Sequence, residues 1–94
     1  MPITIVRYRR STLPDLKLKI MVTKNRKIQD VMQILIQKLR VLGVSLTTSG
    51  IFVFNVNEMN VVFNPGQKLE DIVSRKEALK DGWLDLVYHD HETF

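Results

Sequence analysis

The feature that most constrains the fold is a change of hydrophobic period between residues 22 and 28. In residues 16–22 (LKLKIMV), every second side chain is Leu, Ile or Val, which is the period of a strand with one buried face. In residues 28–42, apolar side chains recur every three or four positions, which is the spacing of one face of an α-helix. A strand that leads directly into an amphipathic helix predicts an α+β domain, with the helix covering one face of a sheet.

Further strands and a short helix are predicted around this pair. Residues 2–8 are rich in β-branched side chains and should form an antiparallel hairpin with residues 16–22. Thr23 or Asn25 is expected to cap the start of the long helix, and Gly43 to end it. The remaining predicted elements are a buried strand at 51–56, a polar turn at 57–60, a short strand at 61–63, a short helix within 69–79, a turn at Asp81-Gly82 and a final strand from Trp83.

The order of these elements resembles that of ubiquitin-like β-grasp domains. A hairpin feeds a long helix, and the last strand returns to the middle of the sheet. We therefore expect an α+β fold with a mixed four- to five-stranded sheet and one long helix across one face. The chain has 94 residues, which support a single core, so residues 1–94 are expected to form one ubiquitin-like domain.

The charge distribution favours acidic partners. The formal net charge is +4, the basic residues gather in the first half, and the acidic residues lie mostly between Glu70 and Glu92. A basic region indicates an acidic protein, an anionic membrane or a nucleic acid as partner. Nucleic acid is not favoured, because the basic segments lack interleaved aromatic residues apart from Tyr8. No apolar run is long enough to span a bilayer and the N-terminus does not resemble a secretory signal, so a cytoplasmic location is expected.

No residue pattern indicates catalysis, a metal or a cofactor. The sequence contains no cysteine, which excludes a thiol nucleophile and a cysteine metal site. His89 and His91 are two residues apart, and without a third ligand nearby they are expected to be solvated surface groups. Neither a nucleophile elbow nor a phosphate-binding loop is present. We therefore expect a binding or modifier domain that is not an enzyme.

The only tryptophan raises the possibility of a binding surface. In the final strand, alternation places Leu84, Leu86 and Tyr88 on one face and Trp83 with Asp85 on the other. If the leucine face is the core, the indole of Trp83 points away from it. A large apolar side chain on the outer face of a sheet indicates contact with a partner.

The last strand also carries a family resemblance. Residues 81–94, DGWLDLVYHDHETF, resemble the closing strand of the autophagy ubiquitin-like modifiers, the GABARAP and microtubule-associated-protein light-chain-3 family. In that family an Asp-Gly, an aromatic residue and an alternating apolar strand precede a Tyr and then Glu-Thr-Phe or Asn-Thr-Phe. MPITIVRYRR is similar to the family's first strand at Pro2, Arg7 and Tyr8, LPDLKLKIMV is similar to its second strand, and IFVFNVNEM resembles its third. The resemblance covers essentially all 94 residues.

The resemblance implies a peptide-binding site beside the second strand. In the family, two neighbouring hydrophobic pockets of the modifier bind autophagy receptors or adaptors. These partners carry a short motif that consists of an aromatic residue, two variable residues and then Leu, Ile or Val. The peptide pairs with the exposed edge of the second strand. The implied aromatic pocket consists of Pro2, Thr4, Lys19, Met21 and Trp83. The implied aliphatic pocket consists of Ile20, Val22, Val31, Ile34 and Leu35.

The resemblance further implies conjugation at the C-terminal end. Family members are joined to phosphatidylethanolamine on autophagosomal membranes through a glycine directly after a terminal Phe, with the help of ubiquitin-like activating and conjugating enzymes. The sequence ends at Phe94, so this route requires a glycine after it. It begins at the strand that two helices precede in the family. Either those helices lie outside this sequence, or the aromatic pocket is reduced and has one open side. The alternatives are a family member attached to a protein instead of a lipid, and a generic ubiquitin-like scaffold domain that binds acidic partners.

Overall fold

The structure is a computed structural model, and it describes residues 1–56, 58–74 and 79–91. The described elements are, in chain order, β1 (Pro2–Arg7), β2 (Leu18–Met21), α1 (Ile28–Val41), the 3-10 turn η1 (Thr48–Gly50), β3 (Phe52–Asn55), β4 (Glu58–Val62), α2 (Leu69–Val73), β5 (Leu79–Lys80) and β6 (Trp83–His89). None of the described helices is long and apolar enough to cross a membrane.

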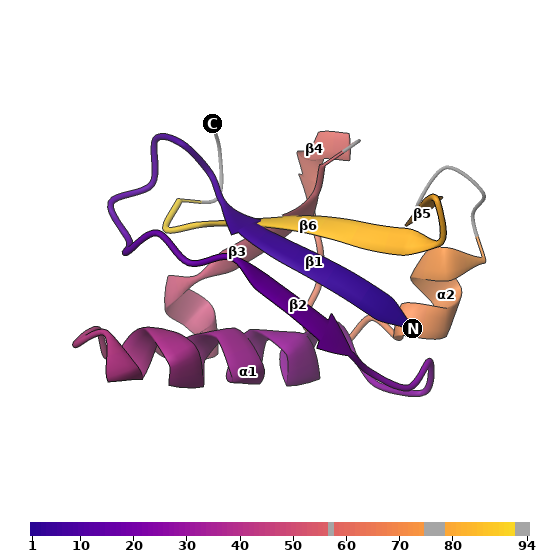
Figure 1. The fold of residues 1–94 in the computed structure, drawn as a ribbon, viewed down its shortest axis with the longest axis horizontal. Coiled ribbons are helices and arrows are strands. Elements are labelled where there is room, and N and C mark those ends of the chain that lie inside the picture. The colour runs from indigo at the N-terminus through magenta and orange to yellow at the C-terminus, as the bar shows by residue number, and fades with distance from the viewer. Residues whose placement is uncertain (57, 75–78, 92–94) are drawn as a thin grey trace.

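The strands form one mixed sheet with the last strand near its middle (Figure 1). The strand order is β2-β1-β6-β3-β4, and β5 pairs with the start of β6. β6 runs parallel to β1 and antiparallel to β3. The predicted α+β, β-grasp arrangement is confirmed, including the hairpin of β1 and β2 and the central return of the last strand. The two-residue strand β5 was not predicted, because Leu79 and Lys80 carry no strand pattern of their own.

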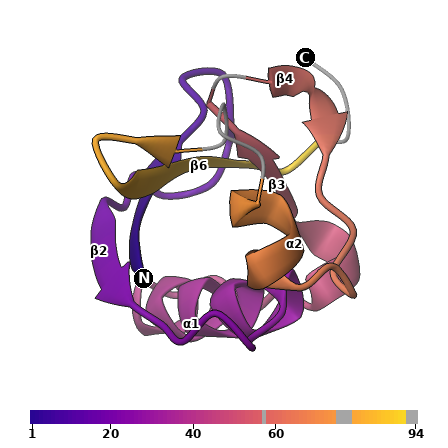
Figure 2. The ribbon, with the colours of Figure 1, turned by 90° about the vertical axis from the view of Figure 1, so that its right-hand side faces the viewer.

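The long helix packs against one face of this sheet, as Figures 1 and 2 show. The core between them contains Ile3 and Ile5 of β1 and Leu84 and Leu86 of β6, all fully buried. The side chains of α1 that enter it are Ile28, Val31, Met32, Leu35, Ile36 and Leu39. They are the three-and-four repeat predicted for the helix, except that Leu42, which was predicted as part of it, follows the end of the helix and is 50% exposed. The opposite face of the sheet is therefore left without a helix from the described part of the chain.

The two ends of α1 differ from one another in how well the sequence predicted them. Gly43 has a φ of +92°, which ends the helix as expected. The start is different, because neither Thr23 nor Asn25 caps it. The helix begins at Ile28, and Asp30 Oδ2 accepts a hydrogen bond from the Lys27 N–H at 2.9 Å. Lys27 also forms a β-bridge with Lys68, which holds the preceding segment outside the helix.

Of three local expectations about strand ends, two are wrong and one is confirmed. The polar segment predicted as a turn at 57–60 is mostly strand, because β4 begins at Glu58 and pairs with Asn55. β4 is the last strand in the order of the sheet, so it forms an edge. The turn at Asp81-Gly82 is confirmed, with φ values of 53° and 83°. His89 was expected at the surface and is instead buried, with its ring edge-to-face against Tyr8.

Candidate functional site

The register of three strands arranges side chains in rows on the face of the sheet opposite α1. We call this the outer face, and it carries Pro2 and Thr4 of β1, Lys19 and Met21 of β2, and the odd-numbered residues of β6. Pro2 lies opposite Met21, and Thr4 lies opposite Lys19. On its other side Thr4 lies beside Asp85. Lys19, Thr4 and Asp85 therefore form one polar row across β2, β1 and β6.

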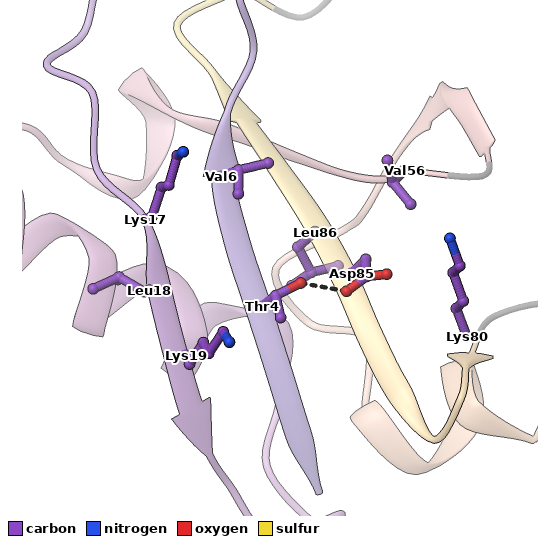
Figure 3. Close-up of a pocket in the computed structure, with 9 residues that line it drawn as sticks. All are labelled: Thr4, Val6, Lys17, Leu18, Lys19, Val56, Lys80, Asp85 and Leu86. Carbon is purple, nitrogen blue, oxygen red and sulfur yellow. Dashed lines mark hydrogen bonds between the residues drawn. The ribbon is translucent and has the colours of Figure 1, made fainter.

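A cavity of about 750 Å³ lies over this row (Figure 3). We call it the outer cavity. Its lining residues are Thr4, Val6, Lys17, Leu18, Lys19, Val56, Lys80, Asp85 and Leu86. In Figure 3, Thr4 and Asp85 lie in the middle, Lys17 and Lys19 on the side of β2, and Lys80 on the opposite side. The outer cavity thus combines an apolar lining with three ammonium groups and one carboxylate.

The polar groups of the outer cavity are only partly paired. The Thr4 hydroxyl donates a hydrogen bond to Asp85 Oδ1. Lys17, Lys19 and Lys80 are exposed, and none lies within 4.0 Å of a carboxylate oxygen of the described residues. With three cations and one anion, the outer cavity favours a negatively charged ligand.

Trp83 lies on the outer face, as the alternation of the last strand predicted. It is half-buried, whereas its neighbour Leu84 is fully buried in the core. Lys19 Nζ lies 5.8 Å from the centroid of the Trp83 ring, a cation–π distance. The indole therefore stands beside the polar row and on the same face as Asp85, and it holds the ammonium group of Lys19 on that side of the cavity.

A second cavity of about 410 Å³ lies on the helix side of β2. We call it the helix-side cavity, and its lining residues are Met21, Val22, Thr23, Arg26, Asp30 and Ile34. It brings together Val22 and Ile34 of the implied aliphatic pocket. Ile20 of that set is half-buried and packs against the core. Val31 and Leu35 are fully buried, so they support the helix side of β2 from within the core.

Between the two cavities runs the free edge of β2. β2 is the first strand in the order of the sheet, so no described strand pairs with its outer side. The Val22 N–H donates to the Met1 carbonyl at 3.1 Å, and the Met1 amino group donates to the Val22 carbonyl at 2.7 Å. Because hydrogen-bonded and non-hydrogen-bonded pairs alternate along an antiparallel ladder, Lys19 and Met21 direct their backbone N–H and C=O groups away from β1. Those groups are available to an added strand.

The implied pocket residues are thus divided between the two cavities and the core. Of the implied aromatic pocket, Thr4 and Lys19 line the outer cavity, Met21 is 73% exposed at the free edge, and Pro2 and Trp83 lie in the adjacent row. Phe94 lies outside the described residues. The implied pockets did not include the other lining residues, namely Val6, Lys17, Leu18, Val56, Lys80, Asp85 and Leu86. The placement of Asp85 could have been read from its alternation with Trp83. Val56 lies in the turn after β3 and Lys80 lies in β5, and the positions of both depend on the folded sheet.

Away from these cavities, a polar clasp joins the loop after β1 to the end of β6. Asp90 accepts hydrogen bonds from the Ser11 hydroxyl at 3.2 Å, from the Thr12 N–H at 3.4 Å and from the Thr12 hydroxyl. Partial burial alone would raise the pKa of Asp90, but the hydrogen bonds from Thr12 and Ser11 lower it to about 2. His89 Nδ1 lies 2.9 Å from Asp90 Oδ1. Across residues 1–56, 58–74 and 79–91, no three His, Cys, Asp or Glu side chains gather as metal ligands.

Comparisons with known proteins add one finding about the fold. No family model and no curated protein sequence matches this chain. The structure is similar to the crystal structure of ATG8 from Trypanosoma brucei, with a TM-score of 0.75 and 22% sequence identity. The match covers 100% of this chain and 75% of the trypanosome chain. It shows an ATG8-like, ubiquitin-type fold, in agreement with the β-grasp topology.

Proposed function

We propose that this chain is a non-catalytic, autophagy-related ubiquitin-like modifier and adaptor. Its partners are autophagy receptors or adaptors that carry short aromatic-x-x-aliphatic motifs, and it binds them by strand addition to β2. The likeness of its fold to that of ATG8 supports the assignment to this class of modifier. No nucleic acid, metal or cofactor takes part.

The observation that carries the proposal is the position of the β2 edge between two cavities on opposite sides of the sheet. In an extended peptide, residues three positions apart point to opposite faces and lie ~10 Å apart along the strand. The spacing of the motif therefore places its aromatic residue on the outer face and its aliphatic residue on the helix side. The free N–H and C=O groups of Lys19 and Met21 supply the backbone hydrogen bonds between the two anchors.

The assignment of anchors to cavities follows from their lining. The outer cavity is the larger one, and its apolar side chains accept a flat aromatic ring beside Trp83. The helix-side cavity has Val22 and Ile34 in its walls and accepts a branched aliphatic side chain. Acidic residues beside the aromatic anchor are attracted by Lys17, Lys19 and Lys80, an effect on association rate more than on affinity.

The proposal extends to conjugation. With a glycine after Phe94, activating and conjugating enzymes of the ubiquitin-like type would join the chain to phosphatidylethanolamine. The protein would then be cytoplasmic until lipidation places it on autophagosomal membranes. Attachment to a partner protein is the alternative form of the same chemistry, and mass spectrometry of the conjugate distinguishes a lipid adduct from a protein adduct.

A peptide titration followed by nuclear magnetic resonance tests the binding proposal. Unlabelled peptide with the aromatic-x-x-aliphatic motif is added to ¹⁵N-labelled protein, and we expect amide shifts at Thr4, Lys19 and Met21 on one side and at Val22 and Ile34 on the other. The control is the same peptide with both anchors replaced by alanine. Absence of shifts along β2 at saturating peptide would refute the proposal.

A second candidate function is supported by the three exposed lysines around the outer cavity. A generic ubiquitin-like scaffold would bind acidic segments through these charges, without need of an aromatic anchor. Its affinity would fall steeply with salt and would be the same for the native peptide and for its alanine control. The two candidates are therefore separated by comparing the two peptides at low and high ionic strength.

A further inference from the structure

One side chain in the outer cavity is chemically unlike the rest of its lining. Asp85 places a carboxylate among Val6, Val56 and the stems of three lysines. It lies in the middle of the polar row, beside Thr4, and it is partly buried. A partly desolvated carboxylate needs hydrogen-bond donors, and its two oxygens together accept about four hydrogen bonds.

The hydrogen bonds made to Asp85 leave one oxygen open. Oδ1 accepts the Thr4 hydroxyl, whereas Oδ2 accepts no hydrogen bond from any residue that the structure describes. Nor does an ammonium group of the described lysines lie within 4.0 Å of it. The nearest candidate by register, Lys19, is instead held over the Trp83 ring. Thr4 thus fixes the orientation of the carboxylate, and its second oxygen is left for a donor that enters the cavity.

We infer that Asp85 is a specificity-determining residue of the peptide site, and that its open oxygen accepts the indole N–H of a tryptophan anchor. The inference rests on the proposed function. It assigns the partner a tryptophan in preference to phenylalanine at the aromatic position. Tyrosine, which donates through a hydroxyl but fills less of the cavity, ranks between them.

The preference follows from what each ring does to the carboxylate. Any aromatic anchor displaces water from Asp85 when it fills the outer cavity. Tryptophan replaces that water with a charge-assisted hydrogen bond, whereas phenylalanine leaves Oδ2 covered and without a donor. A site that contains a buried hydrogen-bonding group discriminates against ligands that lack the complementary group for the same reason.

The test compares two peptides that differ only in one atom group of the anchor. One carries tryptophan, and the other carries 3-benzothienylalanine, in which sulfur replaces the indole N–H at nearly the same size. Fluorescence anisotropy of end-labelled peptides gives both dissociation constants. A hydrogen bond to a charged group predicts about tenfold tighter binding of the tryptophan peptide to the wild-type protein.

Substitutions at Asp85 assign the preference to the carboxylate. In Asp85→Ala the two peptides should bind equally, and in Asp85→Asn a reduced preference should remain, because an amide oxygen is a weaker acceptor. Thr4→Val is the matched control for orientation, and it should reduce the preference without removing it. The wild-type comparison needs no variant, so it stands even if a substitution impairs folding.

The outcomes separate this inference from the proposed function. Equal affinity of the wild-type protein for the two peptides would overturn the role of Asp85 while leaving peptide binding intact. A preference that persists in a folded Asp85→Ala variant would overturn it as well. If neither peptide binds the wild-type protein, the proposed function fails and the inference fails with it.

Discussion

The two cavities that flank β2 are built in different ways. The outer cavity draws its lining from segments far apart in the chain, from Thr4 to Leu86, and strand register brings them together. The helix-side cavity is lined by residues between Met21 and Ile34, a single stretch that runs from the strand into the helix. The first therefore depends on the completed sheet, and the second is encoded locally.

Residues of the outer cavity are therefore expected to contribute to binding and little to stability, whereas residues beneath the helix-side cavity contribute to both. Thr4, Lys19 and Asp85 lie outside the core, so they can be changed with little effect on packing. Beneath the helix-side cavity, Val31 and Leu35 are fully buried members of the core. Substitutions there are expected to alter the fold before they alter binding.

The largest effect is expected from Leu35→Ala. Removing a fully buried leucine leaves a cavity in the core and should lower the free energy of unfolding by about 2–5 kcal/mol. Val41→Ala is the matched control on the same helix, because Val41 is 84% exposed, and it should change stability by less than about 0.5 kcal/mol. Urea denaturation measures both. A small effect of Leu35→Ala would mean that the helix side is open and that the contrast between the two cavities is wrong.

Much of the fold was predictable from the sequence, because its periodicities are local. The buried face of α1 lies within one element and was predicted except for Leu42, which is 50% exposed. The alternation of β6 holds from Trp83 to Leu86, whereas Val87 and His89 are buried as well. The start of α1 was not predicted, since the bridge from Lys27 to Lys68 delays the helix and joins segments 41 positions apart. A contact between segments so far apart in the chain cannot be predicted from local sequence patterns.

The candidate site was less predictable for the same reason. The implied pockets contain Thr4, Lys19, Val22 and Ile34, which line the two cavities. They omit Val56, which reaches the outer cavity from the turn after β3, and Lys80, which reaches it from β5. The Val56 N–H donates to the Asp85 carbonyl at 3.1 Å, a contact that fixes one wall of the cavity only after both strands have paired.

Acid should reveal how far polar contacts stabilise the ends of β1 and β6. The pKa of Asp90 is about 2 in the folded protein against an ordinary value of 3.8, so the folded state favours the ionised carboxylate. The stabilisation is therefore present above pH 3.8 and is lost as the pH falls toward 2. Integrated over that interval it amounts to at most about 2 kcal/mol of the free energy of unfolding, because solvent screens part of the interaction.

The measurement compares the wild-type protein with Asp90→Asn by urea denaturation at several pH values. Their difference in unfolding free energy should shrink on acidification, because the variant lacks the titrating group. A difference that is independent of pH between about 5 and 2 would show that the clasp acts through packing instead of charge.

Met21→Pro tests the free edge of β2, and Met21→Ala controls for the loss of the Met21 side chain from the lining of the helix-side cavity. Proline removes the Met21 N–H, which faces away from β1, and proline is tolerated on edge strands in such positions. Loss of one backbone hydrogen bond to the added strand should weaken peptide binding by about tenfold. Met21→Ala retains the N–H and should cost less. Equal losses in the two variants, measured by calorimetry, would show that the side chain and not the strand edge makes the contact.

The smallest effect is expected at the rim of the outer cavity. Lys17→Gln and Lys80→Gln each remove an exposed cation, which is worth about 0.2–1 kcal/mol, or up to about fivefold in affinity. Because rim charges steer encounter, the change should appear in the association rate and should diminish as salt is added. Lys38→Gln, an exposed lysine in the last turn of α1, is the control and should leave the rate unchanged. Stopped-flow fluorescence at two ionic strengths separates the two rate constants. A change confined to the dissociation rate would place these lysines in direct contact with the peptide, and the outer cavity would then bind through its charges as well as through the Asp85 row.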